Sequence, residues 1–157
     1  MATGDRAVRD EALFLLRRGN AHMSLDEAVA DFPLARINER PPHVPYSSWQ
    51  LLEHLRITQR DIIDFIRDPN YREMTWPDDY WPAPDATTDA AGWARTIAEF
   101  HADAATLEAL ATDPDRDLHA AIPWDDGQTL LRELLVVADH NAYHTGELAI
   151  LRQVMGT

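Results

Sequence analysis

Residues 129–155 read TLLRELLVVADHNAYHTGELAILRQVM and predict one long helix. Apolar side chains recur in this stretch at helical spacing, as one buried helix face requires. They include Leu134, Val137, Leu148 and Leu151. Thr129 precedes the first turn, where its hydroxyl can cap the backbone N–H groups. We therefore expect a helix that begins after Thr129, ends at about Met155 and buries one face.

The same stretch carries two histidines, His140 and His144, four residues apart and on the side of the apolar positions. Imidazoles at this spacing have Cβ atoms about 5–6 Å apart, so both can reach one metal ion at about 2.0–2.1 Å. Ordinary core or surface histidines are the alternative interpretation. Asn141 stands where the H-E-x-x-H motif of zinc metalloproteases has its glutamate, which disfavours that enzyme class.

His54, on the inward edge of an earlier predicted helix, can complete a set of three imidazole ligands. Three protein ligands leave coordination positions open to water or substrate, as in catalytic rather than structural metal sites. No catalytic residue is assigned beyond these candidate ligands. The other histidines lack a partner on the same helix face, and we expect surface or polar-contact roles for them: His22, His43, His101 and His119.

The rest of the chain predicts further helices and no strand, so the expected fold class is all-α. The expected segments are about Asp5–Arg18 with a break at Gly19–Asn20, a short helix from the Ser24–Glu27 capping box to about Asp31, Trp49–Arg67 after an N-cap at Ser47 or Ser48, and about Thr88–Ala111. Residues 68–88 are rich in proline and aromatic side chains. Such a long irregular segment is typical of a connection that crosses the molecule or covers a site.

Composition limits the chemistry that this chain can perform. Its 157 residues fit one domain, which we place at residues 1–157. The chain has no cysteine, and all 14 basic residues are arginine, which excludes a thiolate nucleophile, Cys-ligated zinc and a Schiff-base lysine. The net charge of −13 disfavours nucleic acid and anionic lipid as partners. No apolar run reaches the roughly 18 residues that span a membrane, and residues 1–6 begin no signal segment, so we expect a cytoplasmic protein.

From about residue 11 to the C-terminus, the sequence resembles the DinB-like superfamily of metal-binding four-helix bundles. The resemblance rests on SWQLLEHL at residues 48–55, GQTLL at 127–131 and HNAYHTGEL at 140–148. It implies an up-down-down-up bundle with a long crossover between the second and third helices. It also implies that His54, His140 and His144 ligate one divalent metal ion, most often zinc or nickel.

Relatives with assigned activities are thiol-dependent S-transferases and a thiol-dependent isomerase. The resemblance therefore implies a metal-dependent enzyme that activates a low-molecular-weight thiol, with activation of water for hydrolysis as a second form. A non-catalytic metal-binding or stress-response protein is the alternative, and a structural homodimer with vestigial histidines is a third. The family commonly forms two-fold homodimers. We expect a homodimer here too, because several residues widen the apolar arcs of the first and last helices: Leu15, Leu16, Val136 and Val137.

Several residues are candidates to orient the histidines. Glu147, where the resemblance implies glutamine in many relatives, is a candidate fourth ligand, a hydrogen-bond acceptor for a ligand histidine, or an exposed side chain. Asp61 and Asp139 are candidate acceptors or ordinary solvated charges. The aromatic residues of segment 68–88 are candidates for a lid over the metal site or for ordinary packing: Trp76, Tyr80 and Trp81.

Overall fold

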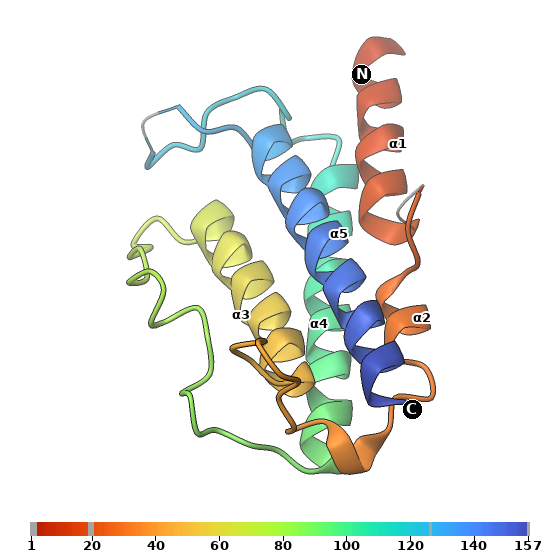
Figure 1. The fold of residues 1–157 in the computed structure, drawn as a ribbon. Helices are drawn as coiled ribbons and strands as arrows, with labels where there is room; N and C mark the ends of the chain where they lie inside the picture. Colours follow the sequence, from red (N-terminus) through yellow and green to blue (C-terminus); the bar gives the residue numbers. More distant parts are fainter. Residues whose placement is uncertain (1–2, 19–20, 126, 157) are drawn as a thin grey trace.

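Four long helices lie side by side in the computed structural model, which describes residues 3–18, 21–125 and 127–156 (Figure 1). They are α1 (Thr3–Arg18), α3 (Ser48–Arg67), α4 (Ala90–Thr112) and α5 (Leu130–Met155). Two short helices, α2 (Leu25–Val29) and the 3₁₀ helix η1 (Leu34–Arg36), lie between α1 and α3 in the chain. The described residues contain no strand, so the prediction of an all-α helical bundle is confirmed.

Side-chain caps set the starts of α3 and α5, the two helices that carry the candidate histidines. The Ser47 side chain accepts a hydrogen bond from the backbone N–H of Gln50, and the Gln50 side chain accepts one from the backbone N–H of Ser47. This capping box satisfies two N–H groups that the first turn leaves free. Thr129 accepts a hydrogen bond from the backbone N–H of Arg132, which confirms the predicted cap of α5.

Two predicted helix ends differ from the structure for local reasons. Helix α4 begins at Ala90 rather than Thr88, because Asp89 caps it by accepting a hydrogen bond from the backbone N–H of Gly92. Helix α2 starts at its predicted capping box but ends at Val29, before Asp31 adopts a φ of 54° that a right-handed helix does not allow. The predicted break at Gly19–Asn20 lies outside the described residues.

The buried side chains form two clusters along the bundle. The first cluster joins α1, α3, α4 and α5 with the segment before α5, and includes Leu13, Ile63, Leu107, Leu118, Leu134 and Val137. The second joins α2, α3, α4 and α5, and includes Leu51, Leu55, Trp93, Phe100 and Leu148. On α5, His140 and His144 fall in sequence between Val137 of the first cluster and Leu148 of the second. The two histidines are therefore placed where the two apolar clusters meet.

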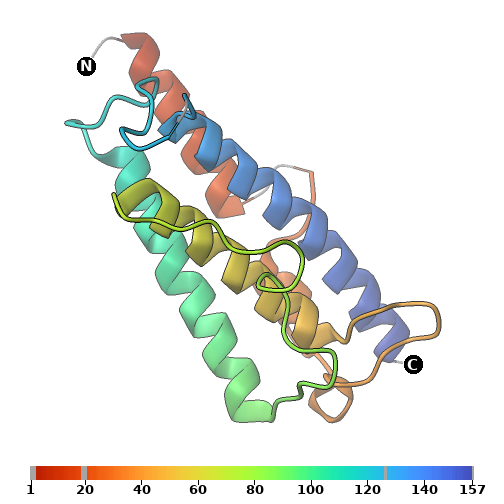
Figure 2. The ribbon, with the colours of Figure 1, turned by 90° about the vertical axis from the view of Figure 1, so that its left-hand side faces the viewer.

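Residues 68–89 form the crossover, which leaves α3 at one end of the bundle, runs along its outside and enters α4 at the other end (Figure 2). The crossover is tied to α3 by polar contacts. The Gln50 side chain donates to the carbonyl oxygens of Ala83 and Pro84 at 3.1 and 3.2 Å. Asp61 accepts hydrogen bonds from the hydroxyls of Tyr71 and Tyr80. These contacts hold the crossover against the helix that carries His54.

The expected apolar surface on α1 and α5 is present in part. Leu15 and Val136 are 41% and 38% exposed. In contrast, Val137 is 1% exposed and Leu16 packs partly buried against the first cluster, so both contribute to the core instead. Two neighbouring side chains add to the exposed surface, namely Phe14 and Leu135. No helix in the described ranges is long and apolar enough to cross a membrane.

Candidate metal centre

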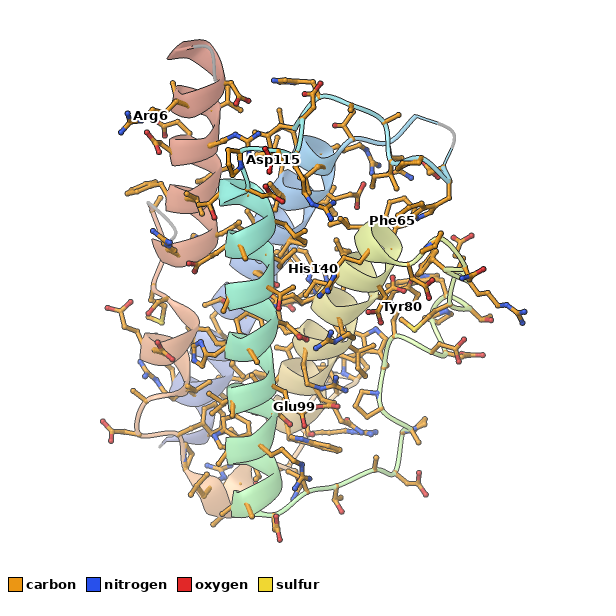
Figure 3. All side chains as sticks on the ribbon, turned by 180° about the vertical axis from the view of Figure 1, so that it is seen from behind. Arg6, Phe65, Tyr80, Glu99, Asp115 and His140 are labelled. Carbon is orange, nitrogen blue, oxygen red and sulfur yellow. The ribbon has the colours of Figure 1, made fainter. Side chains whose placement is uncertain are left out.

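Helices α3 and α5 bring three histidines together inside the bundle. His54 comes from α3, and His140 and His144 come from successive turns of α5. One ring nitrogen from each lies within 4.8 Å of the others. His54 is 1% exposed, and the other two are partly buried. Figure 3 shows His140 near the middle of the bundle and Tyr80 on the crossover beside α3.

The spacing of these nitrogens matches the coordination shell of a single ion. The Nε2 atoms of His54 and His140 are 3.1 Å apart. Two nitrogens bound to one ion at about 2.0–2.1 Å lie about 2.9 Å apart at a right angle and about 3.4 Å apart at the tetrahedral angle. The observed separation lies within this interval. The three rings also meet edge to face, with centroids 4.5 to 5.0 Å apart, an arrangement that lets their nitrogens converge.

The surroundings of His54 fix which of its nitrogens is free. Its Nδ1 lies 2.8 Å from the carbonyl oxygen of Tyr80, and a carbonyl can only accept, so Nδ1 carries the proton and donates it. Nε2 then keeps its lone pair and faces the other two histidines. The indole of Trp81 stacks on the imidazole at a centroid distance of 3.8 Å and an interplanar angle of 5°. The crossover therefore sets both the tautomer and the ring plane of His54.

Glu147 sets the tautomer of His144. Its carboxylate lies 2.7 Å from His144 Nδ1, which leaves Nε2 of that ring free to bind an ion. The Glu147 side chain is 27% exposed. Glu147 also affects Tyr46, because its negative charge and hydrogen bonding add to the effect of burial and raise the pKa of that tyrosine to about 12. Of the three roles considered for Glu147, the structure places it as an acceptor for a candidate ligand. Metal-binding histidines ordinarily have such a partner on their second nitrogen.

Burial keeps two of the imidazoles neutral. Loss of solvent lowers the pKa of His54 to about 4, an effect that the Tyr80 carbonyl offsets only in part. Burial, reinforced by the neighbouring His144 and His54, likewise lowers the pKa of His140 to about 4. Metal binding requires the neutral imidazole, because only the neutral ring has a free lone pair. At neutral pH both rings are therefore ready to bind a cation without first losing a proton.

Other residues weighed from the sequence lie elsewhere. In the described part of the chain, the three histidines are the one group of His, Asp and Glu side chains that converges closely enough to hold a metal. The remaining histidines are exposed, and one of them, His101, pairs with Asp26 at 2.8 Å. Asp139 is exposed, as its interpretation as a solvated charge requires. Asp61 accepts from two tyrosine hydroxyls and, among the residues that the structure describes, from no histidine.

The aromatic residues of the crossover separate into two groups. Trp81 packs directly on His54 and also stacks on Tyr46, with ring centroids 5.0 Å apart. Trp76 is 69% exposed and contacts the ring of Tyr80. Trp81 thus covers one face of the site, whereas Trp76 does not.

A family model described as the DinB superfamily matches residues 20–148 of the chain. The protein belongs to the DinB superfamily. No curated protein and no solved structure matches the sequence significantly. The DinB match spans His54, His140 and His144, so all candidate ligands lie inside the family region. Family membership and the buried histidine cluster together fit metal binding by this DinB protein.

Two features of this DinB site could not be predicted from the sequence. The carbonyl of Tyr80 left no signal, because a backbone acceptor is independent of residue type. Tyr46, which stacks on Trp81, is in the irregular connection before α3, where no periodicity predicts which side chains point inward. In contrast, the Glu147 contact was accessible from the sequence, because residues three apart on a helix are neighbours.

Proposed function

We propose that this DinB superfamily protein binds one divalent metal ion, zinc or nickel, through His54, His140 and His144. The observation that carries the proposal is the convergence of three ring nitrogens within 4.8 Å, two of them 3.1 Å apart. The donor set supports a metal that prefers imidazole nitrogen, because the chain has no cysteine to supply sulfur. The hydrogen bonds from His54 to Tyr80 and from His144 to Glu147 orient two of the three donors.

We further propose that the site is catalytic and activates a low-molecular-weight thiol, as an S-transferase does, or water, as a hydrolase does. A divalent ion with three protein ligands supplies a site where a thiol or water loses its proton near neutral pH. The chain itself offers no thiol, so the thiol nucleophile must be a second small molecule. His144 retains 12% side-chain exposure and its neighbour Tyr143 is 65% exposed, which supports an approach to the site from that side of α5.

The alternative is a non-catalytic metal-binding or stress-response protein. Under this alternative the fourth coordination position is closed by protein or never exchanges. Glu147 is the nearest candidate for closing it, although its contact with His144 already occupies one carboxylate oxygen. A ligand-exchange measurement separates the two functions, because a catalytic site must exchange its bound water or thiol.

The same proposal includes three further statements, on the order of the helices, the oligomeric state and the compartment. The bundle has the up-down-down-up order, which the path of residues 68–89 from one end of the bundle to the other supports. The protein is a homodimer, which the exposed Leu15, Leu135 and Val136 support. Its compartment is the cytoplasm, where the small thiols that we propose as substrates are kept reduced.

The proposed activity is tested by a screen for thiol transfer on protein purified without a nickel column. The zinc-loaded and nickel-loaded forms are each incubated with several small thiols and a panel of electrophiles, and His140→Ala provides the background rate. We expect transfer above background with at least one thiol. If both metal forms bind metal but match His140→Ala with every thiol and in ester hydrolysis, the catalytic proposal is wrong and the metal-binding alternative stands.

A further inference from the structure

Two tyrosine hydroxyls from the crossover meet at one carboxylate on α3. Tyr71 donates to Oδ1 of Asp61 and Tyr80 donates to Oδ2, each at 2.9 Å. Each carboxylate oxygen thus receives its own phenol. An asparagine at this position has a single acceptor oxygen, so it cannot accept from both donors in the same way. The contact therefore uses both oxygens of the carboxylate.

The same crossover residues reach the metal centre. The backbone carbonyl of Tyr80 accepts the Nδ1 proton of His54 at 2.8 Å, and the next residue, Trp81, stacks on the imidazole at 3.8 Å. One residue, Tyr80, therefore connects Asp61 through its hydroxyl to His54 through its carbonyl. Asp61 and His54 lie on the same rigid helix, α3, so a displacement of Tyr80 changes its position relative to both.

We propose that Asp61 is a positioning residue of the metal centre, which fixes the tautomer and ring plane of His54 through Tyr80 and Trp81. This inference rests on the proposed metal binding. By holding both tyrosines, Asp61 keeps the carbonyl of Tyr80 aligned with Nδ1 of His54. His54 then presents Nε2, with a free lone pair, to His140 and His144. Without this contact the ring can take the other tautomer, in which Nε2 carries a proton and binds no ion.

A purely structural role for Asp61 predicts a different result. The crossover has a second attachment to α3, where Gln50 donates to the carbonyls of Ala83 and Pro84. Loss of the Asp61 contacts therefore leaves residues 83–84 held and frees mainly the part that includes Tyr80. If Asp61 only stabilised the fold, its loss would lower the melting temperature without changing His54 in the folded protein.

The test is the full-length Asp61→Asn variant, with Asp64→Asn as its matched control. Asp64 is on the same helix, its side chain is 55% exposed, and its ion pair with Arg60 is long at 4.0 Å. The first readout is the tautomer of His54 in metal-free protein, measured from the ¹⁵N chemical shifts of its ring. The second is Zn²⁺ affinity, measured by competition with a chelator. Mutating a hydrogen-bond partner of a metal-bound histidine typically costs about 10–100-fold in metal affinity. Because Asp61 acts one contact further away, we expect Asp61→Asn to weaken Zn²⁺ binding about threefold to tenfold.

The expected result is a mixed His54 tautomer and weaker Zn²⁺ binding in Asp61→Asn, with wild-type behaviour in Asp64→Asn. A wild-type tautomer in Asp61→Asn overturns the inference, whatever its melting temperature. If Asp61→Asn does not fold, Tyr80→Phe removes the same hydrogen bond while keeping the carbonyl, and a wild-type tautomer in that variant is equally decisive. If the wild-type protein binds no Zn²⁺ or Ni²⁺, the proposed function fails, but the tautomer measurement still decides whether Asp61 positions His54.

Discussion

The contact between Glu147 and His144 gives a quantitative prediction about metal affinity. Replacing Glu147 with alanine removes the acceptor that lies 2.7 Å from Nδ1 of His144. The ring then loses the partner that directs its Nε2 toward His54 and His140. We expect the variant to keep its fold, because the Glu147 side chain is 27% exposed and removing it leaves no buried cavity.

The size of this effect follows from the geometry. Mutating such partners costs about 10–100-fold in metal affinity. The Glu147 carboxylate is part-exposed, so water can replace it as an acceptor, and the lower end of this range applies. We therefore expect about tenfold weaker binding for Glu147→Ala, which corresponds to about 1.4 kcal/mol. Glu147→Gln retains an oxygen that can accept the same hydrogen bond, so we expect it to weaken Zn²⁺ binding about two- to fourfold, less than alanine does.

The assay is competition between each variant and a chelator of known Zn²⁺ affinity at constant pH and ionic strength. Asp139→Asn is the matched control, because Asp139 is exposed on the same helix next to His140. It removes the same charge without removing a partner of the site. If Glu147→Ala and Asp139→Asn bind Zn²⁺ equally tightly, Glu147 contributes only through its charge and our account of His144 is refuted.

Three other predictions concern the folded state and its assembly. First, chelation should lower the melting temperature without unfolding the chain, because two apolar clusters support the bundle; loss of helical circular dichroism on adding chelator at room temperature would instead make the metal structural. Second, burial raises the pKa of Asp103 in the folded state above its unfolded value near 3.8. The stability that Asp103 contributes is therefore complete below pH 3.8 and is lost as the pH rises through the folded pKa. Asp103→Asn removes this pH dependence, so urea titrations should show the variant gaining stability relative to wild type as pH rises from about 4. A difference in unfolding free energy that does not change with pH would contradict the raised pKa of Asp103. Third, light scattering at micromolar concentration should give twice the 17.8 kDa chain mass, also in high salt, and a mass equal to one chain would disprove the homodimer.

The sequence predicted the parts of the fold that depend on local chemistry. The Ser24 and Thr129 caps and the apolar periodicity of α3, α4 and α5 all act within a few residues along the chain. For this reason the helix ends agree to within two residues, including the end of α2, which comes before Asp31 takes a left-handed conformation. Asp89 was accessible as well, because an aspartate before an amphipathic helix is an ordinary cap.

The site was predicted to a lesser degree, because its parts come from separate segments. The pair His140 and His144 follows from helical spacing alone, whereas the approach of His54 depends on how α3 packs against α5. The stacking of Trp81 and the carbonyl of Tyr80 depend on the path of the crossover, which has no periodicity to predict it. Long irregular segments are positioned by contacts that their own sequence does not reveal.

Metal content tests the central claim of this account most directly. Five proteins are purified without a nickel column, loaded with Zn²⁺, desalted and measured by elemental analysis: wild type, His54→Ala, His140→Ala, His144→Ala and His101→Ala. We predict one ion per chain in wild type and in His101→Ala, whose histidine is exposed and pairs with Asp26. The three other variants should lose stoichiometric metal while remaining helical. Equal metal content in all five proteins would contradict a site formed by His54, His140 and His144.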